Sequence, residues 1–309
     1  MAYYMGLDAG ATKTDCALAE DDTILARAAG GTIKTLQASP REAAENLDAL
    51  LKNIAAQSGV SLDSITCTCV GLAGYSVPRV LEWARQALRA RVGGEILLLG
   101  DHEIALDAAF HGGAGVLVVA GTGSNIIART DAGQLIHVGG WGPVVADEGS
   151  GNWIGRQAVR AIFDALDRDE ATTLLERVFD YWELSDVGGL IELVNQSPGP
   201  DFSKLAPLVV ECAGQKDPRA SRVLQQAGNA LGMYAALAAQ RVQAIEPENT
   251  PLPEVAFTGS VLQHIAAVRD AMCATLRREL RDVRIQMTPV ESVRGALWRA
   301  RRHSRGVSA

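Results

Sequence analysis

The chain has 309 residues, a formal net charge of -7 at pH 7 and 48% hydrophobic residues. The acidic balance argues against a nucleic-acid or anionic-membrane surface, and no window approaches the roughly 18 uninterrupted apolar residues of a membrane span. The length allows two domains with sizeable cores. Since the sequence opens on a strand-like segment instead of a signal peptide, and its five cysteines lack zinc-site spacing, we expect a cytoplasmic protein with reduced thiols.

The first candidate site is the segment MGLDAGATKTDCA, residues 5–17. It predicts a strand, a glycine turn and a second strand, whereas a Walker loop needs Gly-Lys-Ser/Thr opening a helix. Gly10 lets the backbone approach a ligand closely, and successive N–H groups in such a turn can bind phosphate. Asp8 would repel a bare phosphate, which suggests a hydrated divalent cation between them. An ordinary hairpin is the alternative.

The rest of the first half alternates helices and strands. Apolar periodicity predicts an amphipathic helix over 40–57, a buried strand over 64–73, a helix over 77–92 and a strand over 94–100. Asp101 follows this last strand, at the carboxyl end where α/β proteins bind their ligands. Asp101 is equally suited to cap a helix that starts at His102.

A second copy of the opening pattern lies in the middle of the chain. Residues 10–25 align without gaps on residues 121–136, and each copy reads as strand, glycine turn, strand, polar turn, strand. The sequence then predicts helices over most of 152–245, and after them a strand over 254–260, a helix over 268–282, a strand over 283–287 and a last helix from Glu291. This alternation predicts an α/β protein of two lobes, each with a mixed sheet, and a ligand cleft between them.

Four segments resemble the actin-like sugar kinases and ATPases. GLDAGATKTDCALAE (6–20) is similar to their first phosphate motif, LVVAGTGSNIIAR (117–129) to the second and VAFTGSV (255–261) to the adenosine motif. VGGWGPVVADEGSGNWIGRQAV (138–159) resembles N-acetylglucosamine kinases of the BadF/BadG/BcrA/BcrD group. The resemblance implies two ribonuclease H-like lobes flanked by helices, the first over 1–112 with the helix of 290–309 returning to it and the second over 113–289.

The resemblance also implies roles for matching positions, with ATP and Mg²⁺ as cofactors. Asp8 would hold Mg²⁺ through water, and Asp101 would be the catalytic base that contacts the sugar hydroxyl. The implied nucleotide-binding residues are Gly10, Thr12, Lys13, Thr14, Gly121, Thr122, Gly123, Ser124, Gly259 and Ser260. The implied sugar-binding residues, besides Asp101, are Lys34, Asn125, Gly140, Trp141 and Asp147. The resemblance alone implies that this protein forms a homodimer.

The function implied is ATP-dependent phosphorylation of an amino sugar at its primary hydroxyl. Phosphoryl transfer has a loose transition state, so a weak base such as Asp101 suffices. Asp147 can bind sugar hydroxyls and also favour the start of a helix. Trp141 either stacks on the sugar or fills the core.

The substrate is where this sequence departs from its relatives. Lys34 stands where these kinases commonly offer an Asn, and Ala73 where they often have a serine. Lys34 then suits a substrate with an extra acceptor or anionic group, or else it points to solvent. We rank N-acetylglucosamine first, glucosamine second and N-acetylmuramic acid third. The alternative function is an ATPase that activates a partner reductase or dehydratase through a shared iron-sulfur cluster, for which Cys67 and Cys69 are the only closely spaced cysteines.

Overall fold

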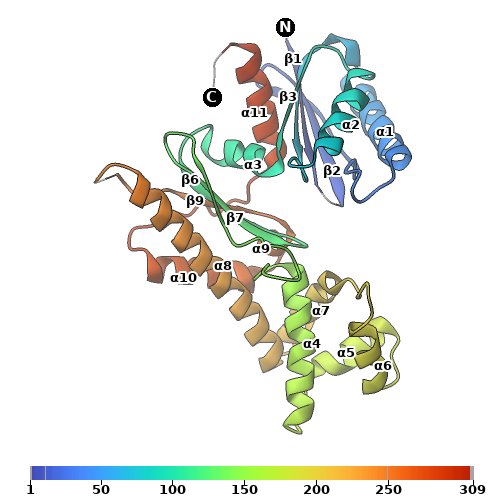
Figure 1. The fold of residues 1–309 in the computed structure, drawn as a ribbon, viewed down its shortest axis with the longest axis vertical. Coiled ribbons are helices and arrows are strands. Elements are labelled where there is room, and N and C mark those ends of the chain that lie inside the picture. Colours follow the sequence, from blue (N-terminus) through green and yellow to red (C-terminus); the bar gives the residue numbers. More distant parts are fainter. Residues whose placement is uncertain (1, 11, 249, 307–309) are drawn as a thin grey trace. The chain divides into compact units, whose positions relative to one another are not determined.

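The computed structural model describes residues 2–10, 12–248 and 250–306 (Figure 1). The chain divides into two compact units, which are described separately below. Unit 1 comprises Met1–Gly113 and Val290–Ala309, and unit 2 comprises Ala114–Pro289. Within the described ranges, no helix combines the length and the apolar character needed to cross a membrane.

Unit 1 is built on a five-stranded mixed sheet in the order β3-β2-β1-β4-β5. The first three strands form an antiparallel meander, and the two remaining strands run parallel to β1. The strands are β1 (Tyr3–Ala9), β2 (Lys13–Glu20), β3 (Thr23–Gly31), β4 (Ile65–Leu72) and β5 (Glu95–Gly100). The helices are α1 (Pro40–Ser58), η1 (Leu62–Ser64), α2 (Pro78–Arg89), α3 (Asp101–Phe110) and α11 (Ser292–Ser304).

The two faces of this sheet bury different helices because side chains alternate along β1. Met5 and Leu7 are fully buried in a core shared with α1 and α2, whereas Tyr4 belongs to a second core shared with α3 and α11. A Cβ added at Gly6 would lie 2.8 Å from the backbone N of Leu297. The lack of a side chain at Gly6 therefore lets α11 rest directly on β1 (Figure 1).

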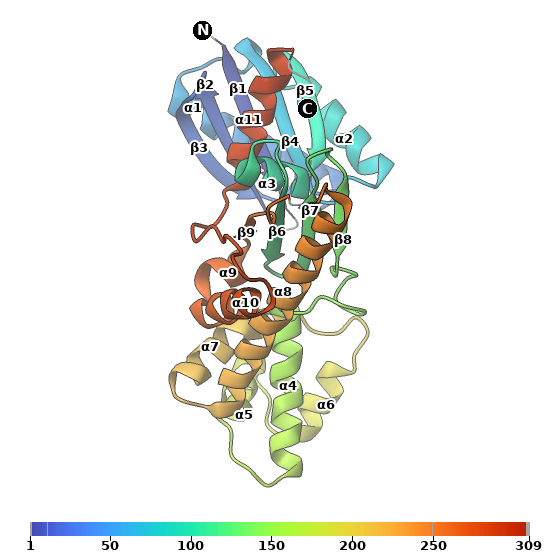
Figure 2. The same cartoon turned by 90° about the vertical axis from the view of Figure 1, so that its left-hand side faces the viewer.

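Unit 2 repeats this arrangement with a four-stranded mixed sheet in the order β8-β7-β6-β9. Its strands are β6 (Gly115–Ala120), β7 (Ser124–Arg129), β8 (Leu135–Val138) and β9 (Val255–Thr258). Its helices are α4 (Gly151–Asp167), α5 (Thr173–Trp182), α6 (Val187–Val194), η2 (Phe202–Leu205), α7 (Ala206–Gly214), α8 (Pro218–Ile245), α9 (Ser260–His264) and α10 (Ala266–Glu279). The long α8 packs on the sheet, and α5 and α6 lie farthest from it (Figure 2).

The two sheets confirm the predicted fold class of mixed sheets flanked by helices. In each unit a meander of three strands is followed by a strand parallel to its first member, β4 beside β1 and β9 beside β6. Gly10 and Gly121 occupy equivalent turns, between β1 and β2 and between β6 and β7. The alignment of residues 10–25 on residues 121–136 thus corresponds to a repeated topology.

The strand predicted over 283–287 is wrong. The segment meets β9 only through an isolated bridge between Val255 and Ile285, with the Gln286 N–H donating to the Val255 carbonyl oxygen at 2.8 Å. The bridge uses only the first residue of β9, and residues 286–290 do not continue as a strand beside the rest of it.

Candidate active site

Acidic side chains gather at one edge of the unit 1 sheet. Asp8, near the carboxyl end of β1, is paired in register with Asp15 of β2 and with Gly71 of β4. Asp101 follows the parallel strand β5, and its Cα is 3.2 Å from the position of a Cβ added at Gly71. Asp8 and Asp101 therefore lie at the same edge of the sheet, at the ends of two strands that are separated only by β4.

Asp101 is the first residue of α3 and does not provide the cap of that helix. Gly100 is the N-cap residue, and Glu103 accepts its backbone N–H through Oε1 at 3.0 Å. The Asp101 Oδ1 accepts the N–H of His102 at 2.9 Å, while 43% of the Asp101 side chain remains exposed. Because Glu103 caps the helix, the exposed part of the Asp101 carboxylate is available to a ligand.

Asp8 has a strongly perturbed acidity. Burial is the largest cause, and together with the negative charges of Asp101 and Asp15 it raises the pKa of Asp8 from 3.8 to about 7. A hydrogen bond from Ser292 and the positive charge of Lys13 oppose this rise in pKa. The edge thus carries more negative charge than its own cations compensate.

The glycine turn beside Asp8 combines exposed and buried residues. Thr12 and Lys13 are exposed, and the Lys13 ammonium pairs with the Asp15 carboxylate at 2.8 Å. Thr14 is fully buried, and its Oγ1 accepts the N–H of Ile33 at 3.2 Å. The Gly10 carbonyl oxygen accepts the Thr32 hydroxyl at 2.8 Å. The turn and the loop after β3 therefore hold each other in place.

Lys34 belongs to that loop and is half-buried. Its backbone N–H donates to the Thr32 hydroxyl at 3.1 Å. Its Cε lies 3.4 Å from the position of a Cβ added at Gly74, in the turn that follows β4. The Lys34 side chain therefore extends along the same sheet edge instead of away from it.

The second glycine turn, in unit 2, is joined to the start of α4. The Gly121 N–H donates to the Gly123 carbonyl oxygen at 2.9 Å, and Ser124 begins β7. The carbonyl oxygens of Gly121 and Thr122 accept the N–H groups of Gly151 and Asn152 at 2.8 and 3.1 Å. The turn thus lies at the amino end of α4, where the helix dipole favours an anion.

A cavity of about 450 Å³ opens beside this turn. That volume lies within the usual range of small-molecule sites. Its walls come from the glycine turn, the start of α4, the η2–α7 region and α9: Gly121, Thr122, Gly151, Ser203, Lys204, Ala206, Pro207, Val210, Ser260, Val261, His264 and Ile265. The cavity is largely apolar with a few convergent polar groups, as a nucleoside site is.

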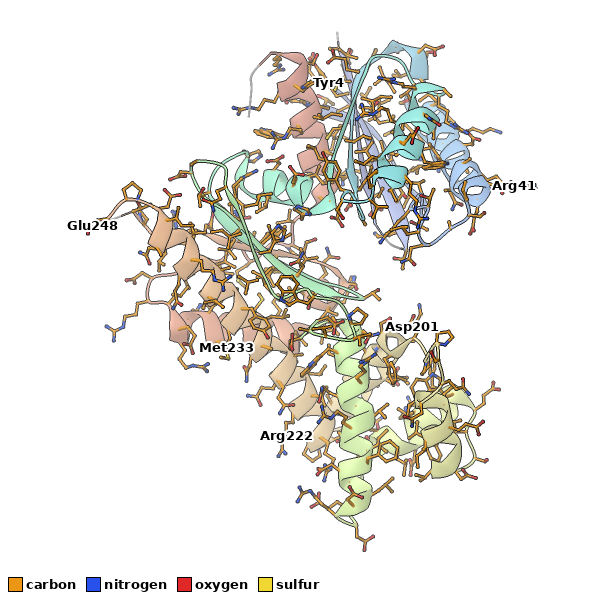
Figure 3. All side chains as sticks on the ribbon, viewed as in Figure 1. Tyr4, Arg41, Asp201, Arg222, Met233 and Glu248 are labelled. Carbon is orange, nitrogen blue, oxygen red and sulfur yellow. The ribbon has the colours of Figure 1, made fainter. Side chains whose placement is uncertain are left out.

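Two local features fix the cavity wall. Gly259 has φ +97°, and a Cβ there would lie 2.3 Å from the Ala120 carbonyl oxygen, so only glycine allows β9 to turn into α9 at this point. Near η2, the Asp201 carboxylate accepts the backbone N–H of Ser203 at 3.0 Å and also its hydroxyl. Asp201 is labelled in Figure 3.

Polar acceptors surround the segment between β8 and α4. Asp147 is 3% exposed and accepts the Ser150 hydroxyl at 2.7 Å. Burial raises the pKa of the Asp147 carboxyl, and the hydrogen bond from Ser150 and the positive charge of Arg156 oppose this rise. The buried Asn125 Oδ1 and Glu148 Oε2 have no hydrogen-bond partner among the described residues. A buried acceptor without a donor is costly, so this arrangement fits a ligand rich in hydroxyl or amide N–H groups.

The loop before Asp147 is shaped by glycine and presents apolar side chains to solvent. Gly140 has φ +70°, and a Cβ there would lie 2.7 Å from the Asn125 Oδ1. Trp141 is 70% exposed and Val144 is 83% exposed. The exposure of Trp141 excludes its alternative role in the core.

The sequence profile of the BadF/BadG/BcrA/BcrD ATPase family matches residues 5–297. The chain belongs to this family. It is 28% identical to the N-acetylmuramic acid/N-acetylglucosamine kinase of Clostridium acetobutylicum over 97% of this chain and 99% of that one. It is 24% identical to the N-acetyl-D-glucosamine kinase of Dictyostelium discoideum over 74% and 73% of the two chains. A solved structure from Chromobacterium violaceum, named as a candidate N-acetylglucosamine kinase, is 27% identical, with a TM-score of 0.74 over 96% of this chain and 98% of that one.

Metal binding in this BadF/BadG/BcrA/BcrD family member would rely on the acidic edge of unit 1. The excess negative charge around Asp8 and Asp101 suits a divalent cation. In the described parts of the chain, no group of three or more His, Cys, Asp or Glu side chains is arranged to hold a metal ion alone. The residues therefore fit a cation that keeps water and phosphate oxygens among its ligands.

Several residues around these features were missed by the sequence reasoning. Ser203, Lys204, Val210 and His264 line the cavity, although none of them falls in a glycine motif. Only His264 stands near a motif that the sequence analysis singled out, because it ends the short helix α9 that begins after Gly259. Glu148 stands next to Asp147, but no signal in the sequence marks it, because the lack of a partner for its Oε2 is visible only in the structure.

Proposed function

We propose that this protein is an ATP-dependent sugar kinase that transfers a phosphoryl group to the primary hydroxyl of an amino sugar, with N-acetylglucosamine as the first candidate. The observation that carries the proposal is the placement of a partly exposed Asp101 beside Asp8 at the carboxyl edge of one sheet. One carboxylate can take the proton of the attacking hydroxyl, and the other can hold the cation that accompanies the phosphates.

ATP binding is assigned to the two glycine turns and the cavity of unit 2. We assign the nucleoside to the cavity lined by Ser260 and His264, with Gly259 shaping its wall. The phosphate contacts are assigned to the turn of Gly121, Thr122, Gly123 and Ser124 and to that of Gly10, Thr12 and Lys13. The Thr14 hydroxyl already accepts the Ile33 N–H. We therefore assign Thr14 a supporting role beneath the Gly10 turn.

Mg²⁺ is proposed as the ion that Asp8 holds through water, and when bound it would neutralise phosphate charge. Asp101 then acts on the sugar. Its carboxylate orients the hydroxyl and accepts its proton late in the transfer, when the oxygen has become acidic, so an ordinary carboxylate is basic enough.

The sugar contacts are assigned to Asn125, Gly140, Trp141 and Asp147. Asp147 and the unpartnered Asn125 Oδ1 supply acceptors for hydroxyl and amide N–H donors. Trp141 offers an exposed aromatic face that can cover the ring of a sugar. The names of the Clostridium and Dictyostelium relatives support an N-acetylated amino sugar as the substrate.

An ATPase that activates a partner enzyme through an iron-sulfur cluster is the competing function. Such a cluster needs thiolates that can reach the metal from the protein surface. All five cysteines are buried, and burial raises the pKa of the Cys69 thiol well above its usual value. This supports the kinase. We extend the proposal to a homodimer on family grounds, and to the cytoplasmic location expected from the sequence.

The test is ADP release measured with a coupled assay over N-acetylglucosamine, glucosamine and glucose. We expect wild-type protein to release ADP with the amino sugars only when Mg²⁺ is present. Asp101→Asn should bind ATP normally and lose about 10²-fold or more in kcat. The control Asp63→Asn removes an exposed carboxylate at the opposite end of β4 and should behave as wild type. Near wild-type turnover by Asp101→Asn, or no sugar-dependent ADP release, would contradict the proposal.

A further inference from the structure

We propose that Ser292, the first residue of α11, is a positioning residue for Asp8, because its hydroxyl fixes the Asp8 carboxylate in the orientation that holds a divalent cation. The inference rests on the role proposed for Asp8 in the sugar kinase site, and it adds a residue that lies outside the glycine motifs. Ser292 acts through Asp8 and takes no part in the phosphoryl transfer itself.

The register of α11 on β1 brings the start of the helix to Asp8. Gly6 and Asp8 lie on the same face of β1, because side chains alternate along a strand. A Cβ added at Gly6 would lie 2.8 Å from the Val293 carbonyl oxygen, so the first turn of α11 covers this face. At the other end of the helix, Arg301 pairs with Asp22 at 3.1 Å in the turn after β2, beside the amino end of β1. The helix α11 therefore runs antiparallel to β1 and begins beside Asp8.

Ion pairs with a neighbouring strand hold the start of α11 in this place. Arg27 of β3 donates from Nη1 to the Glu291 Oε2 at 2.8 Å, and the Arg294 Nε donates to the same oxygen at 2.7 Å. Arg27 is in register with Ala17 of β2, which is itself opposite Gly6 of β1. Since Glu291 is the N-cap residue of α11, the helix start is attached to the cross-strand row of the sheet that carries Gly6.

The Ser292 hydroxyl donates a hydrogen bond to the Asp8 carboxylate. The other groups that act on this carboxylate are charged: Asp101 and Asp15 repel it, and Lys13 attracts it while pairing with Asp15. A serine hydroxyl is neutral and has one proton to donate. It can therefore orient the Asp8 carboxylate without cancelling the negative charge that attracts a cation, and it leaves acceptor positions for the cation or its water.

The experiment measures binding of Mn²⁺, a paramagnetic substitute for Mg²⁺, to the 309-residue chain with ATP and without sugar, by electron paramagnetic resonance. Ser292→Ala should weaken Mn²⁺ binding by about tenfold, the size found when the hydrogen-bonding partner of a metal-binding side chain is removed. ATP affinity without divalent cations should stay unchanged. Ser292→Thr keeps the hydroxyl and should retain most of the Mn²⁺ affinity.

The same substitution in an Asp8→Asn background separates positioning from a general structural role. There, Ser292→Ala should weaken Mn²⁺ binding by less than about twofold, because the carboxylate that Ser292 orients is gone. Ser61→Ala is the matched control, since it removes an exposed serine hydroxyl before β4, at the opposite edge of the sheet, and should leave Mn²⁺ binding unaffected. Should Ser292→Ala fold poorly, Ser292→Cys supplies the same comparison, because a thiol is a weak donor.

Three results would each overturn the inference: unchanged Mn²⁺ affinity in Ser292→Ala, an equal loss with and without the Asp8 carboxylate, or no loss in Asp8→Asn itself. None of them depends on a sugar, so the kinase function is judged separately by sugar-dependent ADP release. If wild-type protein shows no such release while Ser292 and Asp8 remain coupled in Mn²⁺ binding, the proposed function fails and the positioning role of Ser292 stands.

Discussion

Replacing Asp8 with asparagine should stabilise the protein without nucleotide at high pH, although it removes a residue assigned to the active site. Burial and the nearby Asp101 and Asp15 raise the pKa of Asp8 from 3.8 to about 7. Between these two pH values the folded state binds more protons than the unfolded state. The stability that protonated Asp8 contributes is therefore fully present below pH 3.8 and is lost as the pH rises through 7.

The size of the effect follows from the same pKa values. Each pH unit of difference is worth about 1.4 kcal/mol, so ionised Asp8 costs up to about 4 kcal/mol at pH 8. Since the side chain is only half-buried, solvent screening makes this an upper bound, and we expect about 2 to 4 kcal/mol. Asparagine has no charge and avoids the cost.

The assay is urea denaturation at pH 4.5 and pH 8, without nucleotide or divalent cations. The gain in unfolding free energy of Asp8→Asn over wild type should be small at pH 4.5 and grow toward pH 8. Asp63→Asn, at the amino end of β4, removes an equal charge from the opposite edge of the sheet and should show no such growth. An Asp8→Asn variant that is no more stable than wild type at pH 8 would refute the reasoning on burial and like charges.

Three further substitutions test separate parts of the structure. Gly295→Ala places a Cβ 1.8 Å from the Ile104 carbonyl oxygen, so α11 must move from α3 and urea denaturation should show a loss of about 2 kcal/mol or more; an unchanged midpoint would contradict this packing. Val210→Trp fills the unit 2 cavity, and calorimetry should show weakened ATP binding; unchanged affinity would place the nucleoside elsewhere. Trp141→Ala should raise KM for the sugar while the melting temperature stays unchanged, because the side chain is 70% exposed; an unchanged KM would remove Trp141 from the sugar site.

The strands and helices could be predicted because their signals are local. The short apolar run of Tyr3–Ala9 and the apolar face of Pro40–Ser58 each predict one element, and the repeated meander then predicts the order of neighbouring strands. The strand predicted over 283–287 is wrong for a reason that lies in the tertiary structure. Their strand-like composition is real, but in the folded chain the segment meets β9 only at Val255 and then leaves the sheet edge.

The candidate site could also be predicted only in part. The acidic edge follows from strand ends, since Asp8 and Asp101 each stand near the end of a strand that the pattern predicts. The cavity does not, because its wall at Ser203 and Val210 comes from a segment that is brought to the glycine turn only by helix packing. No spacing in the sequence encodes that approach. The buried Glu148 Oε2 likewise becomes informative only when its lack of a partner is visible.

The central claim is that this protein moves the terminal phosphoryl group of ATP to the primary hydroxyl of an amino sugar. The most direct measurement is the structure of the product formed from N-acetylglucosamine, ATP and Mg²⁺, determined by mass spectrometry and phosphorus–proton NMR. The account predicts a sugar heavier by one phosphoryl group, with phosphorus coupled to the protons on carbon 6, and formation of this product about 10²-fold or more slower with Asp101→Asn. Phosphate found on another hydroxyl, or inorganic phosphate as the sole product, would contradict it.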